Sequence, residues 1–156
     1  GRYLMKDHYH LLISELVGGG LVKFMMKVNA GYAKYYNERY KRHGHVFQGK
    51  TKKIFIENEA HFLYILHYVH LNPLDYLKGA TKWRERDKEA IENMKEALEY
   101  LNVYRWSSYF DYCGKKNFPS ILTKDLFSET FENYQEAIKE YLKDAEASSD
   151  IDMALE

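Results

Sequence analysis

Cysteine, long apolar runs and an excess of either charge are nearly absent from this chain of 156 residues. The single cysteine, Cys113, excludes a disulfide framework and a cysteine-rich zinc site, so any metal must be held by His, Asn, Gln or carboxylate side chains. No stretch approaches the roughly 20 apolar residues of a membrane helix, and the first residues do not resemble a signal peptide. With 46% hydrophobic residues, the sequence instead predicts one soluble, intracellular globular domain with no membrane partner.

The net charge of zero conceals a division along the chain. Residues 1–56 contain 11 Lys and Arg against 3 Asp and Glu, a net charge of +8, and the remainder therefore carries −8. An anionic partner is expected to bind the basic part. A chance imbalance on a solvated surface is the simpler interpretation, but the interleaving of basic and aromatic residues favours a nucleic acid.

Hydrophobic periodicity predicts a mixed α+β chain. Residues 3–14 alternate as in a β-strand, which places His8 and His10 on one face. Residues 21–42 are predicted to form an amphipathic helix, and Gly44 lies just beyond its end. A second, partly basic strand is expected within residues 46–56, where the apolar residues at 54–56 follow two lysines.

A second helix is predicted over residues 59–72. Asn58 is its expected N-cap, and Pro73 marks its end. The remaining predicted segments are a charged helix at 83–101, a short aromatic segment at 106–112, an amphipathic helix at 130–142 and a loose acidic tail at 145–156.

The predicted helix at 21–42 carries a basic ridge, because Lys27, Lys34 and Lys41 recur every seven residues and so share one face. Aromatic residues next to lysines are expected to hold single-stranded nucleic acid by stacking on its unpaired bases. The candidate DNA-binding residues are Lys27, Lys34, Arg39, Phe47, Gln48, Lys50, Lys52 and Lys53.

A pair of histidines in a His-x-His arrangement on a strand is able to chelate one cation, although the pattern is weak evidence alone. Tyr68 and Asn72 stand one helical turn apart on the second predicted helix, so a nucleophile and a ligand would be neighbours. Among the 15 tyrosines, Tyr64 is the nearest rival. It lies two turns from Asn72, about 12 Å along the axis, too far to act at a metal bound there.

Four motifs occur in order along the chain: His8-Tyr9-His10-Leu11-Leu12-Ile13, Gly44-His45-Val46-Phe47-Gln48-Gly49, Tyr68-Val69-His70-Leu71-Asn72-Pro73 and Trp106-Ser107-Ser108-Tyr109. Together they resemble the single-tyrosine HUH transposases, and most closely the REP-associated tyrosine transposases. The segment at 126–142 also resembles that branch. The resemblance spans residues 3–109.

The resemblance implies that His8, His10 and Asn72 bind a divalent metal ion, magnesium or manganese, and that Tyr68 is the nucleophile. A 5′-phosphotyrosine would store the energy of the cleaved bond for rejoining. The implied substrate is a single-stranded DNA hairpin with flanking guide bases. The implied setting is the prokaryotic cytoplasm, at the nucleoid, for a monomer or homodimer.

The implied fold is the ferredoxin-like HUH fold, with an antiparallel sheet and helices packed on it. Its catalytic core would span residues 1–80, followed by a helical extension of the same domain at 81–144 and the acidic tail. The family has a strand and a helix before the first histidine, so the resemblance implies either that Gly1 is not the natural start or that the strand comes from elsewhere, such as a swapped partner chain. The extension includes an insertion at 81–101, which would be a lid, an interface helix or neutral padding.

Two pairs of residues depart from the family pattern. Lys6-Asp7 replaces a Pro-Asn pair before the first histidine, and Leu74-Asp75 replaces the usual continuation after Asn-Pro. The residues do not identify a base for the phenol, which ordinarily ionises near pH 10. Two further functions stay open: a catalytically inactive DNA-binding descendant, and a metal-dependent nuclease in which water attacks and Tyr68 only packs.

Overall fold

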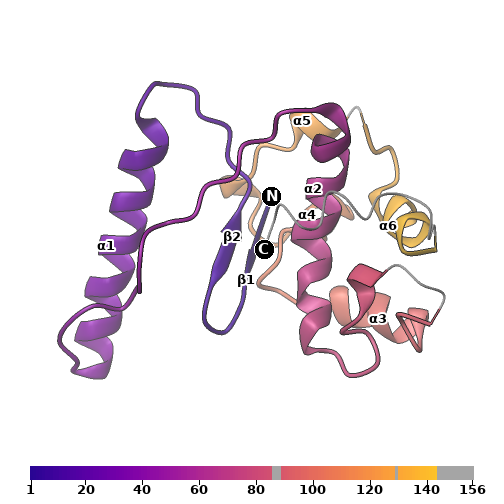
Figure 1. The fold of residues 1–156 in the computed structure, drawn as a ribbon, viewed down its shortest axis with the longest axis horizontal. Helices are drawn as coiled ribbons and strands as arrows, with labels where there is room; N and C mark the ends of the chain where they lie inside the picture. The colour runs from indigo at the N-terminus through magenta and orange to yellow at the C-terminus, as the bar shows by residue number, and fades with distance from the viewer. Residues whose placement is uncertain (86–88, 129, 144–156) are drawn as a thin grey trace. The chain divides into compact units, whose positions relative to one another are not determined.

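The structure is a computed structural model that describes residues 1–85, 89–128 and 130–143. Over these residues the chain forms a mixed α+β fold with one two-stranded antiparallel sheet and several helices, which confirms the predicted class (Figure 1). Among the described helices, none is long and apolar enough to cross a membrane. The acidic tail predicted at 145–156 lies outside the described residues.

The chain divides into two compact units. Unit 1 consists of residues 1–12 together with 55–156, and unit 2 consists of residues 13–54. The expected boundary near residue 80 does not coincide with this division. The predicted catalytic core, residues 1–80, contributes to both units, and the predicted extension belongs to unit 1.

A β-hairpin opens unit 1. Strand β1 (Arg2–Leu4) pairs with β2 (Tyr9–Leu11) so that Tyr3 lies opposite His10. The single strand predicted over residues 3–14 is therefore wrong. The chain reverses at Lys6-Asp7, a polar pair between two alternating segments, and the Met5 N–H donates to the His8 carbonyl at 2.8 Å to close the turn.

The other edge of β1 is also paired. Tyr3 forms a β-bridge with Ser107, the Leu4 N–H donates to the Trp106 carbonyl at 3.0 Å, and the Ser108 N–H donates to the Arg2 carbonyl at 2.9 Å. The last of the four sequence motifs thus lies against the hairpin. Its backbone continues the hydrogen-bonding ladder to a third segment.

Helix α2 (Glu59–Leu71) is the central element of unit 1, between the hairpin and α6 (Tyr134–Lys143) in Figure 1. Both predicted limits are confirmed. The Asn58 side chain accepts from the His61 N–H at 2.8 Å, and Pro73 follows within the 3-10 helix η1 (Asn72–Tyr76). Most of α2 is buried around its circumference, as its apolar sequence requires.

The core beside α2 contains a chain of polar contacts centred on His70. The Tyr134 hydroxyl donates to the Leu66 carbonyl at 3.1 Å, so it accepts from His70 Nδ1 at 2.8 Å. His70 Nε2 lies 2.7 Å from Ser108 Oγ, and this oxygen accepts from the Arg2 N–H at 2.9 Å and lies 3.1 Å from the Arg2 carbonyl oxygen. Burial lowers the pKa of His70 well below its usual value, so the ring is neutral.

Several predicted boundaries are wrong. The helix expected at 83–101 is broken into the 3-10 turn η2 (Trp83–Glu85) and α3 (Met94–Leu101), because Asn93 caps α3 through the Glu96 N–H. The helix expected at 130–142 is α6, which begins only at Tyr134. The other described helices of unit 1 are α4 (Tyr109–Tyr112), η3 (Pro119–Ile121) and α5 (Asp125–Ser128).

Unit 2 contains one long helix, α1 (Gly20–Tyr40), close to its predicted extent. It ends at Tyr40, two residues before the predicted limit, with a left-handed cap at Lys41, where φ is 52°. The strand predicted within residues 46–56 is wrong, since these residues, all of them described, form neither helix nor strand. An apolar run of three residues lacks a neighbouring strand with which to pair.

We predict that Ser108→Ala lowers the free energy of unfolding by about 1 to 3 kcal/mol, because it leaves the buried His70 Nε2 and the Arg2 N–H without their shared partner. Urea titration monitored by circular dichroism measures the change. Ser120→Ala, an identical substitution at an exposed position, is the control and should alter stability by less than about 0.5 kcal/mol. Equal effects of the two substitutions would contradict the structural role of Ser108.

Candidate catalytic site and nucleic-acid surface

His8 and His10, the predicted metal ligands, lie together in unit 1. Their ring centroids are 5.2 Å apart, with His8 in the hairpin turn and His10 in β2. The His10 ring stacks on the buried Tyr3 ring at 4.7 Å with an interplanar angle of 10°. Burial, reinforced by the charges of His8 and Arg84, lowers the pKa of His10 to about 4, so this ring is neutral near pH 7.

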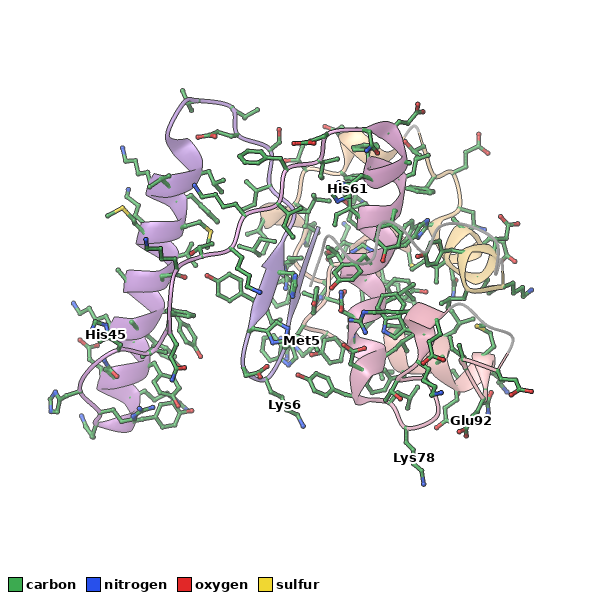
Figure 2. All side chains as sticks on the ribbon, in the orientation of Figure 1. Met5, Lys6, His45, His61, Lys78 and Glu92 are labelled. Atoms are coloured by element: carbon green, nitrogen blue, oxygen red, sulfur yellow. The ribbon has the colours of Figure 1, made fainter. Side chains whose placement is uncertain are left out.

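His8 is held by its neighbour in the turn. Its Nδ1 lies 2.7 Å from Asp7 Oδ1, and this hydrogen bond lowers the pKa of Asp7. An ionised carboxylate only accepts, so His8 Nδ1 carries a proton and donates in this hydrogen bond. Through this hydrogen bond Asp7 orients the His8 ring, and Nε2 is the nitrogen that would bind a cation. Lys6 departs from the family pattern together with Asp7. It lies at the hairpin tip with its side chain directed outward (Figure 2).

Tyr68, the predicted nucleophile, projects from α2 toward the histidines. Its ring centroid is 6.2 Å from that of His10 and 5.9 Å from that of Trp83, and only 5% of the residue is exposed. Tyr64, the rival candidate, is 5.8 Å from Tyr68 and 6.0 Å from Tyr141. Tyr68, which the resemblance implies to be the nucleophile, is therefore the tyrosine whose ring contacts His10.

Asn72, the predicted third ligand, is 2% exposed and lies one turn beyond Tyr68. Its Nδ2 donates to the Tyr68 carbonyl at 2.7 Å, which ties the side chain to the end of α2. Its Oδ1 accepts a hydrogen bond from Arg84 Nη2. An amide oxygen has two lone pairs, so one remains for a second partner.

Arg84 is a member of this cluster that the sequence did not identify. Its guanidinium donates to both carboxylate oxygens of Asp75, at 2.6 and 3.0 Å, and Trp83 Nε1 donates to the same carboxylate at 2.8 Å. The guanidinium carbon lies 5.5 Å from the Tyr68 ring centroid. A fixed cation thus stands beside the candidate nucleophile.

Arg84 stays charged although it is three-quarters buried. Burial opposes the charge, but the hydrogen bonds and charge of Asp75 outweigh it and raise the pKa of Arg84 above its usual value. In the sequence this residue stood in an insertion predicted as a charged helix. The neighbouring Trp83 was the only residue in the sequence to indicate that the segment would be buried. In the structure it is 1% exposed.

The donors gathered here fit a divalent cation in their chemistry. Two imidazoles and an amide oxygen form a mixed ligand set, and such a set leaves coordination positions open for a substrate. Among the described residues, no group of three or more His, Cys, Asp or Glu side chains is placed to hold a metal. The predicted ligand set has only two such side chains, His8 and His10, and its third member is Asn72. The metal therefore remains a prediction.

All eight candidate DNA-binding residues lie in unit 2, which carries nine Lys and Arg against two Glu, a net charge of +7. Lys27 and Lys34 are exposed on α1, where Lys34 lies 3.9 Å from Glu38. Both arginines of the unit contact tyrosine rings, and only Arg39 was selected from the sequence. Arg42 lies 5.6 Å from the Tyr36 centroid.

An aromatic ladder runs along α1. The rings of Tyr32 and Tyr36 are 5.9 Å apart, those of Tyr36 and Tyr40 are 4.6 Å apart, and Phe47 lies 5.7 Å from Tyr32. Tyr32 and Tyr40 are about half exposed. Exposed aromatic faces beside cations are the features that hold single-stranded nucleic acid. Their spacing of four residues places them on one side of the helix.

Comparison of the chain with protein-family models, with curated proteins and with solved structures found no match.

We predict that Lys27→Ala and Lys34→Ala each weaken the binding of single-stranded DNA regardless of its sequence, and lower the slope of log affinity against log salt by about 0.7. Fluorescence anisotropy at several salt concentrations measures both quantities. Lys95→Ala in α3, an exposed lysine 3.9 Å from Glu99 in unit 1, is the matched control. A salt slope equal to that of the wild-type protein would remove Lys27 and Lys34 from the interface.

Proposed function

We propose that this protein is a DNA strand transferase of the single-tyrosine HUH type, which cuts and rejoins single-stranded DNA through Tyr68. The observation that carries the proposal is the contact between Tyr68 on α2 and His10 on β2, at 6.2 Å between ring centroids. Asn72 and Arg84 complete the same cluster. The ferredoxin-like HUH fold is also part of this proposal. The hairpin, its third paired segment and α2 are compatible with part of that fold.

In the proposed reaction the Tyr68 phenolic oxygen attacks the scissile phosphorus. A new bond joins the phosphorus to that oxygen, and the bond to the 3′ oxygen of the preceding nucleotide breaks. The phenol loses one proton and the leaving 3′ oxygen gains one, so the products are a 5′-phosphotyrosine and a free 3′-hydroxyl. Attack by a second 3′-hydroxyl reverses these changes and rejoins the strand, which requires no external energy source.

Each residue of the cluster has a distinct role in this proposal. Arg84 stabilises negative charge on the phosphate and on the phenol oxygen, since a preorganised guanidinium acts strongly in a site with little water. Asp75 and Trp83 keep Arg84 in position. When bound at His8, His10 and Asn72, a magnesium or manganese ion would polarise the phosphate and stabilise the leaving oxygen.

The proposed substrate is a single-stranded DNA hairpin with flanking unpaired bases. Unit 2 supports this choice through its net charge of +7 and its aromatic ladder, which suit phosphates and unpaired bases respectively. A monomer or homodimer at the prokaryotic nucleoid is the setting that goes with such a substrate.

A protein that binds DNA without cutting it is the second candidate. One observation favours it: the basic and aromatic surface of unit 2 contains no residue of the proposed catalytic cluster. Binding could therefore persist in a chain that has lost its chemistry. Covalent trapping separates the two candidates and also tests hydrolysis by water.

We predict that the wild-type protein, mixed with hairpins of fixed stem and randomised flanks in magnesium or manganese, forms a DNA adduct that survives denaturation. Tyr68→Phe abolishes the adduct because it removes the attacking oxygen. Tyr64→Phe makes the same change at the neighbouring buried tyrosine and retains the adduct. Cleavage that persists in Tyr68→Phe without an adduct would instead identify a nuclease, and absence of cleavage by the wild-type protein would favour binding alone.

We predict that Arg84→Gln slows adduct formation about 100-fold, because it removes the cation beside Tyr68, and that Arg84→Lys recovers part of this loss. Single-turnover rates at saturating DNA measure the chemical step apart from binding. Lys82→Gln removes the same charge from an exposed residue of the same segment, 3.5 Å from Glu85, and should react at the wild-type rate. An unchanged rate in Arg84→Gln, with the fold intact by circular dichroism, would exclude Arg84 from the reaction.

A further inference from the structure

The segment Trp106-Ser107-Ser108-Tyr109 is the one sequence motif to which the proposed function gives no role. Three of its four residues are fully buried: Ser107, Ser108 and Tyr109 are each 0% exposed. Trp106 is 48% exposed. Packing explains the buried members, whereas the half-exposed Trp106 ring is the part of the motif that a ligand in solution can contact.

The backbone around Trp106 is fixed from both sides. Its carbonyl accepts from the Leu4 N–H at 3.0 Å and from Arg2 Nη1 at 3.4 Å. Asn117 Nδ2 donates to the carbonyls of the two neighbouring residues, Arg105 at 2.7 Å and Ser107 at 3.3 Å. The exposed ring therefore stands on a rigid support, so a ligand that stacks on it meets a preorganised surface.

The surroundings of the ring are cationic. The Arg105 guanidinium carbon lies 4.9 Å from the Trp106 ring centroid, and Lys115 and Lys116 are exposed in the loop that Asn117 connects to Arg105. Lys115 Nζ reaches Asn102 Oδ1 at 3.5 Å, which places this loop beside the segment that leads to Trp106. We refer to Arg105, Trp106, Lys115 and Lys116 as the Trp106 platform.

No acidic side chain between residues 102 and 124, all of them described, cancels this charge. The one acidic residue there, Asp111, is 3% exposed, and its two oxygens accept from the N–H groups of Asn117 at 3.0 Å and Phe118 at 3.3 Å. Unit 1 as a whole carries a net charge of −7, since unit 2 carries +7 and the chain carries zero. Within residues 102–124, by contrast, the exposed charged side chains are all basic.

We propose that the Trp106 platform binds single-stranded DNA, with one unpaired base stacked on the Trp106 ring and the flanking phosphates paired with Arg105, Lys115 and Lys116. Stacking on an aromatic ring combined with contacts to phosphates is the general mode of single-strand binding. The choice of DNA rests on the proposed function. Local positive charge favours this occupant over a protein interface, whose centre is usually depleted of lysine.

The chain supplies its own reporter for this contact. It has two tryptophans, and Trp83 is 1% exposed, so Trp106 is the one that a ligand in solution can reach. An oligothymidylate of about 15 nucleotides, added to the full chain in low salt, should quench the Trp106 emission as it binds. The duplex of the same length should quench it little, because its bases are already paired and stacked.

Affinity, measured by anisotropy of the same labelled oligothymidylate, gives the second readout. Trp106→Ala should weaken binding by about 5- to 100-fold, the range for loss of one stacked base, while Trp106→Phe should weaken it less. Arg105→Gln should weaken binding and lower its salt dependence. Val103→Ala, at an apolar residue that is 72% exposed nearby, is the matched control and should bind as the wild type does.

Two results would overturn the proposal: oligothymidylate that binds without changing the Trp106 emission, or wild-type affinity in Trp106→Ala. A Trp106→Ala protein that binds normally but sediments as a smaller species would assign the surface to contact between copies of the chain. Failure of the proposed function has a different signature. Quenching and loss of affinity would persist while the wild-type protein forms no adduct that depends on Tyr68.

Discussion

The burial of His70 between Ser108 and Tyr134 is the constraint on which the arrangement of unit 1 depends. A neutral imidazole buried in the core needs a hydrogen-bond partner at each nitrogen. A buried polar atom without a partner would lower the stability of the fold. The partners of His70 come from α6 and from the segment paired with β1. By satisfying one ring, the fold fixes these two elements against α2.

This constraint also determines which side of α2 is available for chemistry. Residues two positions apart point in different directions on a helix, so the burial of His70 in the core leaves Tyr68 free to face the hairpin. Asn72, one turn later, shares the direction of Tyr68. The ion pair between Arg84 and Asp75 lies on this side of α2. Arg84 stays charged although it is mostly buried, because its carboxylate partner is buried with it.

Local signals in the sequence predicted α2 well, whereas contacts between distant segments were not predictable. Asn58 and Pro73 determine where the helix begins and ends through hydrogen bonds within a few residues. The hairpin turn at Lys6-Asp7 was missed because it lacks the glycine or asparagine that usually marks a tight turn. Arg84 was missed for a different reason, since its position depends on packing of Trp83 against α2 and no periodic pattern encodes that contact.

The Trp106 platform and the catalytic cluster belong to the same unit. Cleavage at one phosphate requires the strand to be held in register with Tyr68, and an error of about 1 Å can cost about 100-fold in rate. Trp106 is hydrogen-bonded to β1, and β1 is paired with β2, which carries His10. A base stacked on Trp106 would therefore be positioned in the same rigid frame as the catalytic cluster. Contacts on unit 2 would add affinity, and contacts on unit 1 would select the phosphate that is attacked.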